Sequence, residues 1–233
     1  MKKLFFFLPF FLFCFGLKCN NLDYSSILEN CETFSINLKN FLNWSYIDEE
    51  EVVGWIGLGP TRDLKGLPDG NVKFKGIPFY IYSHRKNNKK CAISLGYSYQ
   101  IPVLKFPMRV GPIPVNKKVD YLFFLHSAAW VRGTKGLPVG KYIINYDAKN
   151  NIKKEIILKK GFQIDDWIVA GSVKLEDGEV AWKKDLSKSK RKGGIYIFMW
   201  KNPFPDIPVK SIVIEGNKNA QLIILAITGA TKK

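Results

Sequence analysis

Residues 119–130, with the sequence VDYLFFLHSAAW, form the longest apolar run after the N-terminus. Pro112 and Pro114 precede this run and Gly133 follows it, so residues that interrupt regular structure bracket it. Its aromatic content favours a strand over a helix. Both alternating faces are apolar in the middle, which predicts a strand covered on both sides. His126 and Trp130 are expected to share one face near its C-terminal end.

The rest of the chain reads as short strands separated by Gly, Pro and Asn turns, and no amphipathic helical period persists for three turns. Strands are predicted at 34–38, 91–95, 141–146, 152–158, 194–200, 209–215 and 222–228, and the segment 71–82 is expected to contain a strand that ends in GIPFYIY. The pairs 141–146 with 152–158 and 209–215 with 222–228 are predicted as hairpins. Residues 20–33 are expected to be a loosely packed lead-in. This pattern is typical of an all-β sandwich or barrel.

The first 19 residues have the features of a secretory signal. Lys2 and Lys3 form a positive start, and an apolar segment follows at 4–17, too short for a comfortable membrane-spanning helix. We therefore expect residues 1–19 to be removed and residues 20–233 to form a single β-sandwich domain, secreted to the extracellular space, the periplasm or the cell surface. No other segment is expected to span a membrane.

The formal net charge of +16 raises the question of a nucleic-acid partner. The cations are nearly all lysines, scattered through predicted loops and strand edges such as KNNKK at 86–90 and KKDLSKSKRK at 183–192. Lysine in such places solvates loops and protects sheet edges from pairing with other chains. The distribution therefore favours a solvated surface over a nucleic-acid interface.

Cysteine usage is compatible with an exported protein, in which disulfides are permitted. Cys14 would leave with the signal, so that Cys19, Cys31 and Cys91 would remain. An odd number allows at most one bridge. Cys31–Cys91 is the preferred pair, because Cys19 falls in the expected tail. The alternative with three free thiols stays open.

Four stretches follow one another in a recognisable order: GWIGLGPTRDLKGLPDGNVKFKGIPFYI, GPIPVNKKVDYLFFLHSAAW, LPVGKYIINY and IYIFMWKNPFPDIPVKSIVI. This succession resembles the galactose-binding-like jelly-roll module that is appended to secreted glycoside hydrolases, and it covers roughly residues 34–229. The resemblance implies a jelly-roll β-sandwich of two antiparallel sheets that binds a glycan or polysaccharide, in association with a glycoside hydrolase. It implies no reaction, because the hydrolytic residues of such enzymes lie in another domain.

Sugar binding needs flat apolar rings for stacking, together with planar polar groups that bond hydroxyls. Loops 54–68, 126–133 and 162–183 are expected to build such a site. The candidate ligand-binding residues are Trp55, Arg62, Asp63, His126, Trp130, Trp167 and Trp182. Each has a structural alternative: a core position for a tryptophan or His126, and a salt bridge or turn cap for Arg62 and Asp63. Trp200 is expected in the core.

Two further classes of function stay open. Glycoside hydrolysis would need two carboxylates facing each other across a sugar. The sequence does not select a pair among Asp63, Asp120, Asp165, Asp166, Glu176, Asp177 and Glu179, and no catalytic residue is predicted. The third class is a structural or surface-assembly protein. Two histidines are too few for a His-rich metal site, and no cofactor is expected, although a structural calcium ion stays open.

Overall fold

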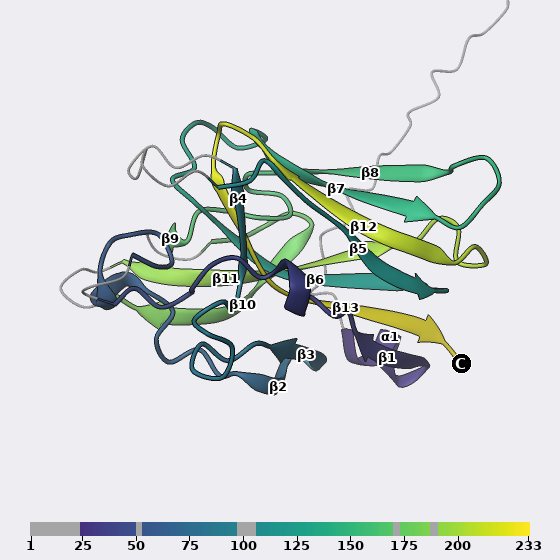
Figure 1. Cartoon of the computed structure of the whole chain (residues 1–233), viewed down its shortest axis with the longest axis horizontal. Helices are drawn as coiled ribbons and strands as arrows, with labels where there is room; N and C mark the ends of the chain where they lie inside the picture. The colour runs from purple at the N-terminus through teal and green to yellow at the C-terminus, as the bar shows by residue number, and fades with distance from the viewer. Residues whose placement is uncertain (1–23, 50–52, 97–105, 170–172, 187–190) are drawn as a thin grey trace, which may run out of the picture.

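The computed structural model describes residues 24–49, 53–96, 106–169, 173–186 and 191–233 (Figure 1). The regular structure in these ranges is almost all β, and the paired strands run antiparallel. The predicted all-β class is confirmed, and its two main sheets pack in a sandwich-like arrangement. The expected signal segment and Cys19 lie outside the described residues.

The larger sheet has seven strands, and its main path runs in the order β1-β13-β6-β11-β10. In addition, β4 pairs with β13, and β9 pairs with β11. The bounds are β1 Cys31–Ser35, β4 Ile93–Gly96, β6 Tyr121–Ala129, β9 Ile168–Val169, β10 Gly178–Asp185, β11 Lys192–Lys201 and β13 Gln221–Lys232. Strand β10 therefore forms one edge of this sheet.

The smaller sheet has four strands in the order β5-β12-β7-β8, and a separate hairpin joins β2 to β3. The bounds are β2 Gly70–Phe74, β3 Ile77–Ile81, β5 Arg109–Lys117, β7 Pro138–Tyr146, β8 Lys153–Lys159 and β12 Val209–Gly216. Three short helical elements complete the described chain: α1 Tyr24–Glu29, η1 Lys39–Phe41 and η2 Pro60–Arg62.

Strand β6 confirms the prediction made for the apolar run at 119–130. It pairs with β11 on one side and with β13 on the other. Every residue from Leu122 to Ala129 is buried. Alternating side chains supply two separate cores, as Phe124 belongs to one cluster and Phe123 to the other. A strand with paired edges and two covered faces needs apolar residues throughout, and this explains the unbroken hydrophobic run.

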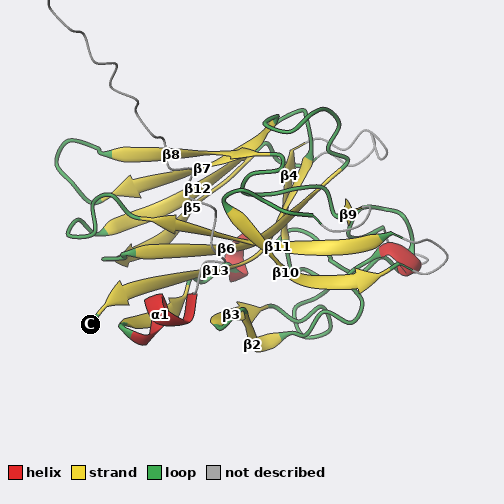
Figure 2. Cartoon of the chain, turned by 180° about the vertical axis from the view of Figure 1, so that it is seen from behind, coloured by secondary structure: helices red, strands yellow, loops and turns green. Residues whose placement is uncertain are grey.

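The two cores lie on opposite faces of the larger sheet. The first core fills the space between the two main sheets, with Tyr142 of β7 stacked on Phe124 at a centroid distance of 4.0 Å. The second core lies on the outer face, where residues of α1, the β2–β3 hairpin and the loops between them cover the sheet. Figure 2 shows α1, β2 and β3 on that side of β13 and β10. The larger sheet is thus the middle layer of the molecule.

Strand β13 is the most extensively paired strand of the larger sheet. One of its edges pairs with β6 over most of its length. Its other edge is shared, because residues 221–224 pair with β4 and residues 228–232 pair with β1. The register against β6 shifts between Ile224 and Ala226, which marks a bulge.

The predicted hairpin of residues 209–215 and 222–228 is wrong, although both strands exist. Strand β12 pairs with β5 and β7 in the smaller sheet, whereas β13 lies in the larger sheet. The connection crosses between sheets, and the side-chain amides of Asn217 and Asn219 both donate to Pro138 O at 2.8 Å. Each strand gains partners on both edges in this way, which a two-stranded hairpin cannot provide.

The predicted hairpin of residues 141–146 and 152–158 is confirmed as β7 and β8. The strand expected within residues 71–82 is confirmed as β3, and β2 precedes it, so that the segment forms a hairpin. Its turn places Lys75 at φ 53° and Gly76 at φ 81°, the positive pair that suits a tight turn between twisted strands. The expected loose lead-in is also corrected, because residues 24–29 form α1 and Tyr24 is buried against the second core.

The preferred disulfide between Cys31 and Cys91 is absent, and both are free, buried thiols. Burial raises the pKa of Cys91 to about 12, which leaves almost no thiolate at neutral pH. We expect both thiols to react with a charged alkylating reagent only after unfolding. Mass spectrometry after labelling at pH 8, with and without urea, measures this. Rapid labelling of Cys91 in the folded protein would contradict it.

Candidate functional site

The three loops predicted to carry the site converge on the outer face of the larger sheet. Trp55 of the first loop meets Trp167 of the third loop edge to face, with ring centroids 5.1 Å apart. Trp167 also stacks on Trp182 at 6.4 Å. The backbone N–H of Trp167 donates to Ala128 O at 2.6 Å, which ties the third loop to the end of β6. Candidates that are distant in sequence therefore gather at one place.

These rings belong mainly to the second core. Trp55 and Trp167 are both 0% exposed, so they take the core position that the sequence left open as the alternative to ligand binding. The loops that carry them fold back over the sheet, and this covers both rings. The indole N–H of Trp167 donates to Arg62 O at 3.2 Å, so Arg62 contributes its backbone here. Trp182 is half-buried.

Asp63 forms a salt bridge, which was the structural alternative to a ligand-binding role. Its side chain is 0% exposed, and its Oδ1 pairs with Lys184 Nζ of β10 at 3.0 Å. Its Oδ2 accepts a hydrogen bond from Asp48 N at 3.1 Å. Asp63 therefore fastens the loop to the sheet, while the side chain of the neighbouring Arg62 is exposed.

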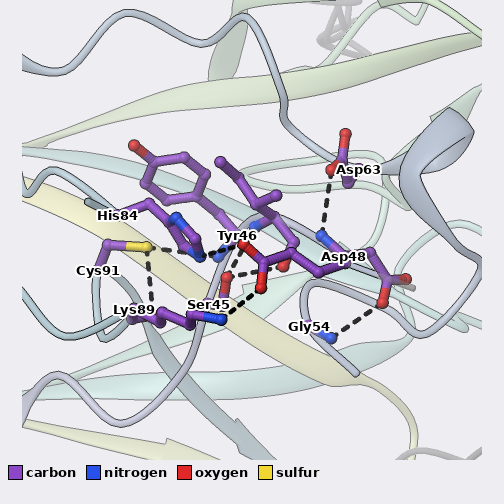
Figure 3. A network of polar contacts seen from close by, with 10 residues as sticks. Ser45, Tyr46, Asp48, Gly54, Asp63, His84, Lys89 and Cys91 are labelled. Carbon is purple, nitrogen blue, oxygen red and sulfur yellow. Dashed lines mark hydrogen bonds and ion pairs between the residues drawn. The ribbon is translucent and has the colours of Figure 1, made fainter. Parts of the chain in front are cut away.

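Asp48 continues this network and binds backbone N–H groups of the Gly-rich loop at residues 54–59 (Figure 3). Its two carboxylate oxygens accept hydrogen bonds from Gly54 N at 2.9 Å and Gly59 N at 2.8 Å. A Cβ at Gly54 would lie 1.9 Å from Ile47 O, so this close approach requires glycine. The sequence offered one sign of this network: glycines and aspartates lie close together at residues 48–63, and aspartate side chains can bind the backbone N–H groups of such a loop.

His84 also lies in this network, although it was not among the candidates (Figure 3). Burial lowers its pKa, and its Nε2 lies 3.9 Å from Glu49 Oε1, while Lys89 pairs with the same carboxylate. These residues border a pocket of about 1120 Å³. Among the described residues that line this pocket, Tyr46 is the one tryptophan or tyrosine, and its ring is buried. This pocket therefore offers no exposed tryptophan or tyrosine ring on which a sugar could stack.

His126 is a core residue, and both of its ring nitrogens have hydrogen-bond partners. It is 0% exposed and lies between Tyr142 and Phe198 in the first core. Its Nε2 lies 3.0 Å from the carbonyl oxygen of Gln163, which can only accept, so Nε2 carries the proton. Its Nδ1 accepts from the Tyr142 hydroxyl at 2.7 Å. Burial lowers the pKa of His126 to about 4, so the ring is neutral at pH 7.

Trp130 does not share a face with His126, which corrects the expectation from strand alternation. Trp130 follows the last residue of β6 and has φ 61°. This left-handed conformation breaks the alternation of side chains and turns the half-buried indole toward the second core. His126 and Trp130 therefore lie on opposite faces of the sheet.

A groove of about 810 Å³ follows the edge strand β10, and two partly exposed indoles line it. Trp182 lines it on the side of the second core, and Trp200 of β11 lines it on the side of the first core. Both rings are half-buried. A bulge between Val180 and Trp182 lets β10 bend at this point.

The expectation that Trp200 belongs to the core is confirmed only in part, because its half-buried ring packs against the first core and also lines the groove. Its strand is apolar in sequence, which suggested full burial. The burial along β11 changes from complete at residues 193–198 to partial at Met199 and Trp200. Alternation within β11 gives no signal of where full burial stops.

Among the described residues, no group of three or more His, Cys, Asp or Glu side chains is arranged to hold a metal ion. The same ranges contain no helix with the length and apolar character that crossing a bilayer requires. Comparison with known protein families and with curated proteins gives no match. The function therefore has to be inferred from the residues themselves.

Proposed function

We propose that this protein is a secreted, non-catalytic glycan-binding module of the galactose-binding-like jelly-roll type, with its binding site in the groove along β10. The observation that carries the proposal is the pair of half-buried indoles, Trp182 and Trp200, on either side of the sheet edge. The charged start and apolar segment within residues 1–19 support export.

The groove has the composition that sugar recognition needs. An indole offers a large flat face at little entropic cost, because its side chain has only two rotatable torsions. Ammonium groups that can donate to hydroxyls lie beside the rings, including those of Lys183 and Lys201. Among the described residues, no strand pairs with the outer edge of β10, so this edge adds backbone donors and acceptors. A glycan chain that crosses this edge would contact both rings.

Binding is favoured over hydrolysis because the acids of the groove already have partners. Glu179 pairs with Lys75 at 3.6 Å, Glu176 pairs with Lys135, and Asp177 accepts from the Gln163 amide at 2.8 Å. Elsewhere, both carboxylate oxygens of Asp166 accept backbone N–H groups. Burial raises the pKa of Asp166, but its hydrogen bonds give it a structural role in the loop.

The test is a glycan array followed by titration of the best ligand. We expect Trp200→Ala to weaken binding by about 1–3 kcal/mol, as for an aromatic hot spot, with a moderate loss of stability because the half-buried ring packs against the first core. Trp182→Ala should weaken binding as well, with a larger effect on stability because this ring stacks on Trp167. Calorimetry on each variant separates affinity from unfolding.

Tyr80→Ala provides a matched control. Tyr80 is 41% exposed on β3 and does not line the groove, so its loss should leave binding unchanged. Equal affinities for wild type, Trp200→Ala and Trp182→Ala would exclude the groove as the site. Absence of binding to any glycan on the array would reject the proposed function.

A further inference from the structure

We infer that the glycan bound in the β10 groove is anionic, carrying carboxylate or sulfate groups. This inference rests on the proposed function and names the chemical class of its ligand. It follows from the distribution of ion pairs around the groove, which leaves cations available and engages the anions within the protein.

Four lysines line the groove, and three of them make no ion pair within the described residues. Lys75 pairs with Glu179. Lys174, Lys183 and Lys201 are exposed, and no described carboxylate pairs with them. They come from the loop before β10, from β10 itself and from the end of β11. Three ammonium groups from separate segments therefore border the same groove.

Two of the three acids of the groove are already ion-paired, and the third is held by a hydrogen bond from a neutral amide. Glu176 pairs with Lys135, which comes from the loop between β6 and β7. Asp177 accepts a hydrogen bond from Gln163. Glu179 lies next to Lys75 at the β2–β3 turn. A neutral sugar would satisfy none of the three remaining ammonium charges, whereas a negatively charged sugar would pair with them directly.

The position of the indoles makes the inference specific to this surface. Lysines occur over the whole protein, and a general attraction to polyanions would follow from the net charge alone. Here the unpaired lysines flank Trp182 and Trp200, so stacking and charge pairing act on the same ligand. The expected preference is therefore for an anionic glycan that also presents a sugar ring to the indoles.

The experiment compares ligands that share a backbone and differ only in charge. Polygalacturonate is measured against its methyl-esterified form, and dextran sulfate against dextran, by isothermal titration at 50 and 300 mM salt. We expect the charged member of at least one pair to bind about tenfold or more tightly than its neutral partner, and this preference to shrink at high salt. The two pairs distinguish carboxylate from sulfate as the preferred group.

Charge variants assign this preference to the groove. The triple variant Lys174→Gln/Lys183→Gln/Lys201→Gln should lower affinity for the anionic glycan about tenfold, since three exposed ion pairs would be lost. A second triple variant, Lys149→Gln/Lys210→Gln/Lys218→Gln, changes the net charge equally at exposed sites outside the groove. It should retain nearly full affinity.

Three results would overturn the inference. Equal binding of charged and neutral members would show that charge is not recognised, while leaving the glycan-binding proposal intact. Equal losses in the two triple variants would show attraction by net charge alone. If no member of either pair binds, and the glycan array is also negative, the proposed function itself fails.

Discussion

Replacing Trp167 with alanine is expected to lower the free energy of unfolding by about 3–5 kcal/mol, the usual loss for a large buried aromatic side chain. The ring is 0% exposed and lies between Trp55 and Trp182. Its removal leaves a cavity that the paired strands around it cannot close. Urea unfolding at pH 7 measures the change. A loss below about 1 kcal/mol would show that the second core does not depend on this ring.

Gly193 offers a sharp control for this prediction. A Cβ at Gly193 would lie 2.2 Å from Trp167 Cη2, so Gly193→Ala should destabilise the wild-type protein by steric overlap. The same substitution should be tolerated once Trp167 is alanine, because the space is then empty. A double-mutant cycle would detect this as strong non-additivity. Additive effects would mean that the ring lies elsewhere.

His126 is expected to make the protein less stable by about 3 kcal/mol as the pH falls from 6.5 to 4. Its pKa is lowered to about 4 by burial, from an ordinary value of 6.5. Well above pH 6.5 the ring is neutral in both folded and unfolded chains, so it adds no pH dependence there. Between the two values the unfolded chain binds the proton more readily, and the folded state loses stability.

The variant His126→Gln separates this effect from the titration of carboxylates. A glutamine can accept from Tyr142 and donate to the Gln163 carbonyl, as the imidazole does, without binding a proton. Its stability should fall less steeply with pH than that of the wild type when unfolding is followed in urea. His84→Gln serves as the control that retains His126. Parallel pH profiles for wild type and His126→Gln would contradict the prediction.

Local sequence patterns predicted strands well and their partners poorly. Strand β6 was evident because every one of its residues must be apolar when two neighbours and two cores surround it. The β7–β8 hairpin was evident from two periodic runs around a short turn. The separation of β12 and β13 into different sheets was not evident, because a four-residue connection fits a hairpin and a crossover equally well.

The candidate site shows the same limit at the level of single residues. The sequence located the loops that converge, but it could not tell which tryptophans face outward. Trp167, a candidate for the site, is covered, whereas Trp200, which was expected in the core, is only half-buried. Exposure depends on which other segment packs over a ring, and that segment is distant in sequence. The ion pairs that leave Lys174 and Lys183 unpaired are invisible for the same reason.

The placement of β13 has a consequence for the order in which this chain can fold during synthesis. Strand β13 follows all the other strands in the sequence, yet β1, β4 and β6 all pair with it. A ribosome therefore releases those three strands before their common partner has been made. Contacts between β1 and β13 span almost the whole described chain, and such distant contacts slow folding. Until β13 arrives, one edge of the apolar strand β6 stays open, so this is the interval in which the nascent chain most needs protection from aggregation.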